Sequence, residues 1–331
     1  MGIDKDSWEG KNVFLTGANG FLGSNIAKTL VENKANVIVL LRDNLPQSVL
    51  NYTGTYNKLR AVLWGDITNY KLVERILNEY EIDTCIHVAA QAIVTTANTN
   101  PTSTFESNIK GTWTILEACR NAKNIESVVV ASSDKTYGDQ EKLPYTEEST
   151  LNACYPYDAS KACTDILCRT YFKTYELPVA VTRCANIYGG GDLNFSRIVP
   201  DTIRLVLQGK PPVIRSDGTP VRDFVYVGDI VNAYLTLAQS IGKEGVNGEA
   251  FNFGSNSPIS VLDLAKKIID ISGKEIVPDV QGKSKPNAEI DKQYLSIEKA
   301  KKILGWEPKF SLEEGLKKTI AWYDEFFNKQ E

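Results

Sequence analysis

A short glycine-spaced turn near the start of the chain constrains its fold more than any other feature. Residues 13–16 are largely apolar, Gly17, Gly20 and Gly23 follow, and residues 24–33 continue as a helical pattern. Gly17 allows a tight turn, Gly20 lets the backbone approach a pyrophosphate, and Gly23 lets the helix pack closely on the strand. The N–H groups and positive dipole end of the helix can then hold phosphate. This strand-turn-helix context predicts a dinucleotide site, with a plain structural turn as the alternative interpretation.

Length and charge limit the remaining possibilities. A chain of 331 residues is long enough for two domains, or for one large domain with an added lobe. Its 37 basic and 41 acidic residues give a net charge of −4 without a basic block, so nucleic acid is not an expected partner. No apolar run approaches the length of a membrane helix and the first residues are polar, so we expect neither a membrane segment nor a signal peptide.

The cysteines and the single histidine argue against metal and disulfide chemistry. The six cysteines form no Cys-x-x-Cys pair, which favours buried thiols in a reducing cytosol. His87 is the only histidine, so we expect neither a zinc site nor a histidine-based triad, and no metal at all.

Apolar runs alternate with helical patterns from the start of the chain to about residue 185. Runs typical of buried strands cover 13–16, 37–41, 59–63, 84–88, 128–132 and 179–183, and helical patterns cover 21–33, 69–80, 101–122 and 156–175. Strands that are apolar on both faces and joined through helices predict an α/β fold with a doubly wound parallel sheet. Because such sheets bind ligands beyond the carboxyl ends of their strands, functional residues are expected just after each run.

The pattern changes after Asn186, where glycines at 189–191 and prolines at 200, 211, 212 and 220 indicate loops. Strands are expected at 221–227 and 249–253, returning to the main sheet, and helices at 261–271, 297–303 and 312–327. We therefore expect two units. The first covers residues 1–185 together with the strands returning from about 221–253, and the second is a smaller mixed α/β lobe over 186–331, whose loops suit a substrate lid.

A tyrosine and a lysine at the head of one expected helix form the clearest catalytic pattern. Tyr157 and Lys161 are four residues apart and therefore share a helical face, and Ser133 follows the strand before that helix. A nearby ammonium is expected to lower the pKa of the phenol toward that of a general base, and Ser133 is placed to hydrogen-bond the same reacting oxygen. The joint placement favours catalysis over a packed tyrosine beside a solvated lysine.

Together these motifs resemble the extended short-chain dehydrogenase/reductase family, which includes nucleotide-sugar epimerases and 4,6-dehydratases. The resemblance covers nearly the whole chain: TGANGFLG at 16–23, GDI at 65–67, HVAAQA at 87–92, SNIKGT at 107–112, SSDKTYG at 132–138, YDASK at 157–161, RCANIYGGGD at 183–192, VRDFVYVGDIV at 221–231 and KILGWEPKFSLEEGL at 302–316. It implies a Rossmann domain with tightly bound NAD, a C-terminal lobe that binds a nucleotide sugar, and a homodimer formed through the helices near 101–122 and 156–175.

The resemblance also implies roles for individual residues. Ser133, Tyr157 and Lys161 match the family's catalytic triad, with Asp134 and Lys135 beside it. The implied cofactor contacts are Gly17, Asn19, Gly20, Phe21, Leu22, Gly23, Arg42, Asp66, Ile67, Ala89, Ala90, Gln91, Asn108, Tyr157 and Lys161. The implied substrate contacts are Asn186, Asn194, Arg197, Arg222 and Asp291. For Arg222 the alternative interpretation is a surface salt bridge.

Two departures from the family pattern leave specificity open. Leu41 occupies the position where NAD-preferring relatives usually have an acid, so Arg42 raises the possibility of NADP while Asp43 could still serve NAD. Dehydratases of the family usually have Asp-Glu after the catalytic Ser or Thr, whereas this chain has Asp134-Lys135. We therefore expect a 4-epimerase acting on a UDP-hexose or UDP-N-acetylhexosamine through a 4-keto intermediate. The alternative is a 4,6-dehydratase of the CDP-glucose, GDP-hexose or dTDP-hexose type, since CDP-glucose 4,6-dehydratases are similar in having Asp-Lys.

Overall fold

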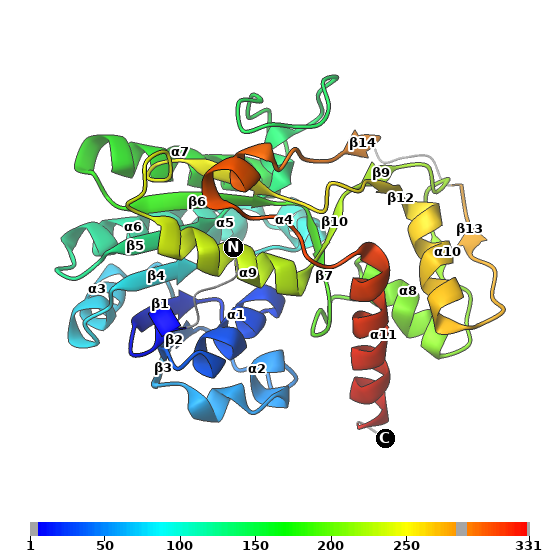
Figure 1. Ribbon diagram of the computed structural model, residues 1–331, viewed down its shortest axis with the longest axis horizontal. Coiled ribbons are helices and arrows are strands. Elements are labelled where there is room, and N and C mark those ends of the chain that lie inside the picture. The colour runs from blue at the N-terminus through cyan, green and yellow to red at the C-terminus, as the bar shows by residue number, and fades with distance from the viewer. Residues whose placement is uncertain (1–5, 283–289, 330–331) are drawn as a thin grey trace.

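The computed structural model describes residues 6–282 and 290–329. Within these residues, seven parallel strands form the main sheet in the order β11-β6-β5-β4-β1-β2-β3 (Figure 1). The strands are β1 (Asn12–Thr16), β2 (Asn36–Leu41), β3 (Ala61–Trp64), β4 (Thr84–His87), β5 (Ser127–Ala131), β6 (Val179–Cys184) and β11 (Ala250–Phe253). The strand order reverses beside β1, which places a crevice at its carboxyl end. This is the expected Rossmann-like α/β fold.

Helices cover both faces of the sheet because successive side chains of each strand point to opposite faces. Val13 and Leu15 of β1 pack in the core shared with α1 (Phe21–Glu32) and α9 (Val227–Ser240). Phe14, between them, packs in the opposite core with α3 (Tyr70–Glu79) and α6 (Gly111–Asn121). The central residues of β1 are therefore apolar on both faces, and α7 (Pro156–Tyr175) lies beside α6 on that second face.

Shorter elements connect the layers. They are η1 (Asp6–Trp8), α2 (Val49–Tyr52), η2 (Thr55–Lys58), α4 (Val94–Thr99), α5 (Pro101–Phe105), the π-helical turn η3 (Glu106–Lys110) and the 3₁₀-helix η4 (Asp134–Tyr137). The expected helix over 101–122 is thus α5, η3 and α6 in succession.

The smaller lobe contains α8 (Ile198–Leu207), α10 (Val261–Ser272) and α11 (Leu312–Asn328), to the right in Figure 1. Its short strands are β7 (Asn186–Tyr188), β8 (Val213–Ile214), β9 (Val221–Arg222), β10 (Phe224–Tyr226), β12 (Ile259–Ser260), β13 (Asp279–Val280) and β14 (Lys292–Gln293), and the π-helical η5 spans Ala300–Leu304. They pair as β12-β9-β14, β10-β7 and β13-β8.

One expected strand is wrong in its placement. Residues 249–253 do return to the main sheet, where β11 pairs with β6, but residues 221–227 do not. Asp223 divides that run into β9 and β10, because its buried carboxylate accepts from the Ser255 N–H over 2.9 Å and from the Ser255 hydroxyl over 2.5 Å. Each half then pairs with strands outside the main sheet.

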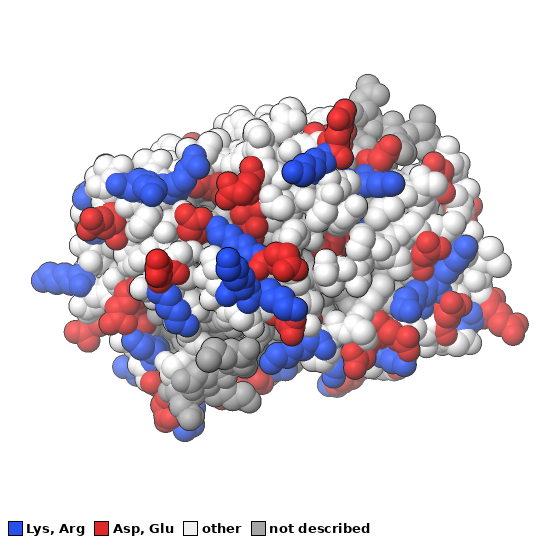
Figure 2. All heavy atoms as spheres, turned by 45° about the horizontal axis from the view of Figure 1, so that its top comes forward, with Lys and Arg blue, Asp and Glu red and all other residues white. Residues whose placement is uncertain are grey.

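The surface carries both signs of charge. On the face shown in Figure 2, basic and acidic side chains lie interspersed, in keeping with the net charge of −4. Among the described residues, no helix combines the length and the apolar character needed to cross a bilayer.

Candidate active site

The carboxyl ends of the main-sheet strands open into a cavity of about 1740 Å³, which the smaller lobe lines on its other side. The glycine turn forms part of its wall. Gly17 has φ +71°, and a Cβ on it would lie 2.7 Å from the Ala89 nitrogen, while a Cβ on Gly23 would lie 2.1 Å from the Gly17 oxygen. The turn therefore packs directly against the loop that follows β4, and Gly23 brings α1 close to the turn.

The first turn of α1 suits an anionic group. Gly20 is its N-cap, and within the described chain no side chain caps the helix. Gly20, Phe21, Leu22 and Gly23 all line the cavity, so the N-terminal N–H groups and the positive end of the helix dipole are directed toward it. Gly20 and Gly23 have no side chain, which leaves room at the backbone for a pyrophosphate, and the residues present thus fit a dinucleotide.

The end of β2 bears on cofactor choice. Leu41 is 3% exposed and belongs to the core, so it cannot reach a ligand. Arg42 and Asp43 instead line the cavity, and the Arg42 Nε donates to the Asp43 carboxylate over 2.8 Å. Asn19 donates from its amide to the Asp43 carbonyl over 2.8 Å. The arginine expected to favour a 2′-phosphate is therefore already engaged by a carboxylate.

The other expected cofactor contacts divide into two groups. Asp66, Ile67, Ala89, Ala90 and Gln91 line the cavity. Asn108 does not belong to the cavity wall of the described chain: its carbonyl oxygen accepts from the Gln91 N–H over 2.7 Å, and its amide donates to the Ser160 hydroxyl over 2.9 Å. Asn108 therefore supports the Gln91 loop from a buried position, and its direct contact with the cofactor stays a prediction.

Ser133, Tyr157 and Lys161 meet at the cavity, where β5 ends and α7 begins. Lys161 donates from Nζ to the carbonyl of Ala131 over 2.8 Å, and burial lowers its pKa to about 8, opposed by nearby Asp165. Protein surrounding Tyr157 raises the pKa of its phenol to about 12, against the effects of a hydrogen bond with Ser133 and of the Arg197 charge. The expectation that Lys161 lowers the Tyr157 pKa is wrong for this structure, since the ammonium is directed at the Ala131 carbonyl.

His87 plays no part at the cavity surface. Its ring is buried between the hydroxyls of Thr16, 2.7 Å from Nδ1, and Thr112, 3.3 Å from Nε2. Burial lowers its pKa to about 3, so the imidazole is neutral. Because Thr16 also accepts from the Ala89 N–H over 3.2 Å, the histidine supports the loop beside the glycine turn.

Asp134 and Lys135 lie next to the triad. Asp134 is 2% exposed, and its Oδ1 accepts from the Ser133 hydroxyl over 3.2 Å and lies 3.8 Å from the Lys135 Nζ. Its Oδ2 has no hydrogen-bond partner within residues 6–282 and 290–329. Both residues line the cavity, so a buried carboxyl oxygen is available there for proton transfer.

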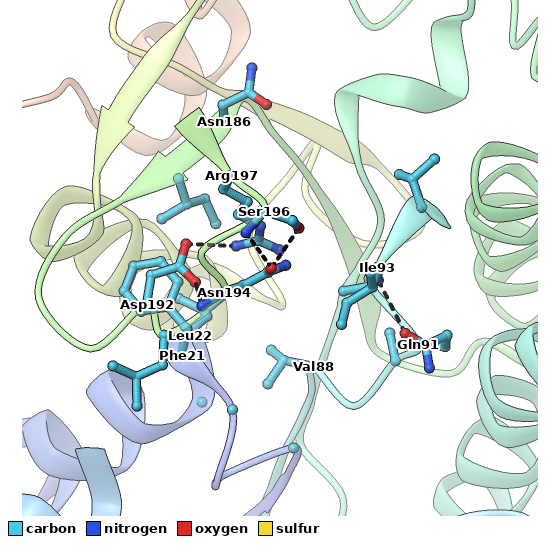
Figure 3. Close-up of a pocket in the computed structure, with 18 of the residues that line it drawn as sticks. Phe21, Leu22, Val88, Gln91, Ile93, Asn186, Asp192, Asn194, Ser196 and Arg197 are labelled. Atoms are coloured by element: carbon cyan, nitrogen blue, oxygen red, sulfur yellow. Dashed lines mark hydrogen bonds and ion pairs between the residues drawn. The ribbon is translucent and has the colours of Figure 1, made fainter. Parts of the chain in front are cut away.

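The substrate side of the cavity comes from the smaller lobe. Asn186, Asn194, Arg197 and Arg222 line it, and Figure 3 shows Arg197, Asp192, Asn194 and Ser196 facing Gln91 and Ile93 across the cavity. The Arg197 Nη1 lies 3.0 Å from Asp192 Oδ2. Asp291 is not part of the described cavity wall, and its carbonyl accepts from the Arg222 Nη1 over 3.3 Å. Asp291 thus lies next to Arg222, and its contact with the substrate stays a prediction.

The cavity thus joins a dinucleotide cradle to a tyrosine–lysine–serine centre and to a wall from the smaller lobe that includes Arg197 and Arg222. A model of the GDP-mannose 4,6 dehydratase family matches residues 14–319. The chain belongs to this family. Family membership confirms that it is an extended short-chain dehydrogenase/reductase of the nucleotide-sugar epimerase and dehydratase group.

Curated relatives of this family member include many 4,6-dehydratases. The dTDP-D-glucose 4,6-dehydratase of Bos taurus is 31% identical over 332 residues, covering 96% of this chain and 90% of its own. A trifunctional Arabidopsis thaliana enzyme, named for UDP-glucose 4,6-dehydratase, 3,5-epimerase and reductase activities, is 31% identical over 327 residues. That match covers 97% of this chain but 48% of the plant enzyme, so the chain spans about half of that relative's length.

Solved structures of the same family group include both reaction types. The UDP-glucose 4-epimerase of Thermotoga maritima, solved with UDP-glucose, has a TM-score of 0.85 at 31% identity, covering 96% of this chain and 99% of its own. A dTDP-glucose 4,6-dehydratase of Streptomyces venezuelae, solved with NAD, has a TM-score of 0.84 at 28% identity, covering 96% and 98%.

Two residues near the triad of this family member, Gln293 and Asp158, were not predicted from the sequence. Gln293 accepts from the Lys135 Nζ over 3.4 Å, although 158 positions separate the two. Burial raises the pKa of Asp158 to about 6, opposed by Lys135 and reinforced by Asp134. Asp158 adjoins Tyr157 and carried a weak signal as a carboxylate in the YDASK motif, whereas nothing local marked Gln293.

Proposed function

We propose that this protein is an NAD-dependent nucleotide-hexose 4,6-dehydratase. The observation that carries the proposal is the buried Asp134 carboxyl, whose Oδ2 has no partner in the described chain and which lines the same cavity as Ser133 and Tyr157. A buried carboxyl oxygen without a partner, next to Ser133, is placed to exchange a proton with a bound substrate. The many dehydratases among the relatives support this reaction over the 4-epimerase expected from the sequence.

The first half of the reaction oxidises the sugar at C4. NAD supplies a hydride acceptor at C4 and a hydride donor at C6 when it is bound in the cradle of Gly17, Gly20 and Gly23. Tyr157 takes the proton of the C4 hydroxyl, and Ser133 hydrogen-bonds the same oxygen as it becomes a carbonyl. Lys161, bonded to the Ala131 carbonyl, ties α7 to β5 and so keeps Tyr157 and Ser133 at the same end of the cavity.

The second half removes water across C5 and C6. Asp134 gives its proton to the C6 hydroxyl, and the C6–O bond breaks with its electron pair, so that water leaves. The Lys135 amine, in its neutral form, takes the C5 proton, and the electrons of the C5–H bond form the C5=C6 double bond. The 4-keto group acidifies C5–H, which is why oxidation at C4 must come first. Addition of a hydride at C6 and a proton at C5 completes a 4-keto-6-deoxy sugar.

A 4-epimerase acting on a UDP-hexose or UDP-N-acetylhexosamine is the second candidate. Two observations favour it: Lys135 occupies the position where dehydratases of the family usually have glutamate, and the chain resembles the Thermotoga maritima UDP-glucose 4-epimerase. In that reaction the 4-keto sugar would rotate before reduction, and Asp134 and Lys135 would have no chemical role.

NAD is proposed over NADP because the Arg42 guanidinium is bonded to Asp43.

We further propose a homodimer through α6 and α7, since Trp113 and Ile166 on these helices are 45% and 49% exposed. Sedimentation of the wild type and of Trp113→Glu tests the proposed dimer. A charge buried at the interface would shift the protein toward monomer. An unchanged sedimentation coefficient for the variant would contradict the interface.

Mass spectrometry of the nucleotide sugar after incubation tests the reaction. UDP-, GDP-, CDP- and dTDP-linked glucose and N-acetylhexosamines are offered in turn. A product lighter by one water supports the dehydratase, and a product of equal mass with altered retention supports the epimerase. Turnover of none of these sugars would contradict both.

A further inference from the structure

The strand β14 joins the two sides of the active-site cavity through one buried glutamine. Gln293 is 1% exposed, and its side-chain amide bonds twice to the segment that carries Asp134 and Lys135. Nε2 donates to the Asp134 carbonyl over 3.1 Å, and Oε1 accepts from the Lys135 Nζ over 3.4 Å. The Gln293 side chain thus bonds to the backbone of Asp134 and to the side chain of Lys135.

The same glutamine is in register with a substrate-side arginine. β14 pairs in parallel with β9, with Gln293 opposite Arg222, and Arg222 lines the cavity. The Arg222 Nη1 also donates to the Asp291 carbonyl, two residues before Gln293. A displacement of Arg222 would therefore carry β14 and Gln293 with it.

The chain after β14 is held to the loop that follows η4. Tyr145 donates from its N–H to the Tyr294 carbonyl over 3.0 Å and accepts from the Ser296 N–H over 2.8 Å. Its hydroxyl donates to the Gly138 carbonyl over 2.9 Å. Since Tyr145 is fully buried, this segment has little freedom, and the Gln293 amide presents a fixed pair of hydrogen-bonding groups.

We propose that Gln293 is a positioning residue that sets the Lys135 amine against the substrate C5 and couples this placement to the Arg222 side of the cavity. A lysine side chain has four rotatable carbon–carbon bonds and needs an external partner to hold one geometry. Asp134 lies 3.8 Å from Nζ, too far for a hydrogen bond, which leaves Gln293 as the partner that fixes Nζ among the described residues.

The neutral amide also matters chemically. Lys135 takes the C5 proton only as a free amine, and a hydrogen bond to a carboxylate would favour the ammonium. The charged groups facing Lys135 are Asp134 from η4 and Asp158 from α7, both carboxyls, whereas β14 contributes an uncharged acceptor. An amide therefore holds the lysine without placing a further carboxyl group against its Nζ.

The proposal rests on the proposed dehydration and is tested by separating its two halves. In Gln293→Leu, single-turnover absorbance of the reduced nicotinamide reports C4 oxidation, and mass spectrometry reports loss of water. We expect oxidation within about twofold of wild type and elimination slower by about tenfold or more, the effect of losing a hydrogen bond to a charged or reacting group. KM should change little, because Gln293 does not line the described cavity.

Two further variants separate positioning from folding. If Gln293 acts through Lys135, the double variant Lys135→Met/Gln293→Leu eliminates no more slowly than Lys135→Met alone. Gln293→Glu should move the rising limb of the elimination pH profile to higher pH, because the carboxylate favours the ammonium of Lys135. Gln208→Leu, which removes an exposed amide contact with Lys210, is the matched control and should leave both rates unchanged.

The outcomes distinguish the two proposals. If the wild type gives a product of unchanged mass, the dehydratase is wrong and the role of Gln293 falls with it. If the wild type eliminates water, the role of Gln293 alone is overturned by additive losses in the double variant, by equal slowing of oxidation and elimination, or by an unshifted pH profile in Gln293→Glu.

Discussion

Lys161 donates from Nζ to the main-chain carbonyl of Ala131, the last residue of β5, over 2.8 Å. The bond ties α7 to the strand that precedes Ser133, so helix and strand approach the cavity as one unit. It also directs the ammonium away from the Tyr157 phenol, although four residues along a helix place the two side chains on one face. Lys161 is thus buried and hydrogen-bonded, and its burial disfavours the charged ammonium form in the folded protein.

Burial of the Lys161 charge predicts that this residue lowers the free energy of unfolding while it supports activity. Burial lowers the Lys161 pKa from 10.5 to about 8, so between these values the unfolded chain binds more protons than the folded one, and stability rises with pH through this window. Lys161→Met should therefore stabilise the fold by about 1–3 kcal/mol near neutral pH while reducing activity. Denaturant unfolding at neutral pH and above pH 10.5 measures it, and a variant less stable than wild type at neutral pH would refute the argument.

Tyr157→Phe should reduce turnover by about 100-fold or more, because removal of a general base costs that much. The ring still packs, so the melting temperature should stay within a few degrees of wild type. Turnover assayed beside circular-dichroism melts provides the measurement. Retained turnover would contradict the role given to the phenol.

The glycines of the turn should separate folding from cofactor binding. A Cβ on Gly23 would lie 2.1 Å from the Gly17 oxygen, whereas on Gly20 the nearest atom would be 3.3 Å away. Gly23→Ala is therefore expected to disrupt the turn and lower the melting temperature, and Gly20→Ala to fold but to bind NAD more weakly. Calorimetry with NAD and thermal melts compare the pair, and equal melting temperatures would count against the packing argument.

Arg42 and Asp43, at the end of β2, should control the choice between NAD and NADP. Asp43→Ala removes the carboxylate that engages Arg42, which frees the guanidinium for a 2′-phosphate. The ratio of NAD to NADP affinity should fall by about tenfold, a change within reach of one charge-assisted contact. Arg42→Ala is the control and should weaken NADP binding alone. Fluorescence titration with both dinucleotides decides, and an unchanged ratio in Asp43→Ala would exclude this role.

Local patterns were sufficient to predict the main sheet and the glycine turn, because each rests on neighbouring residues. The alternating runs before residue 185 place the strands, and the spacing of Gly17, Gly20 and Gly23 places the cradle. The Tyr157–Lys161 pair was likewise predicted from helical periodicity, and these side chains do meet Ser133 at the cavity.

What sequence reasoning missed depends on contacts between distant segments. Asp223 divides an apolar run because Ser255, 32 residues later, supplies its partners. The raised pKa of Tyr157 reflects the protein that surrounds it, not the lysine one turn along. Gln293 reaches Asp134 and Lys135 across more than 150 positions, so no local motif could indicate it.

The position of β11 has a consequence for how this molecule can be divided. β11 lies at the edge of the main sheet beside β6, and α9 packs over β5 and β6, although both elements follow the first segment of the smaller lobe in the chain. Cleavage after Ala185 would leave β6 as an open edge and uncover the apolar face beneath α9. No single cut can release the dinucleotide-binding part intact, and a fragment that ends there is expected to aggregate instead of folding.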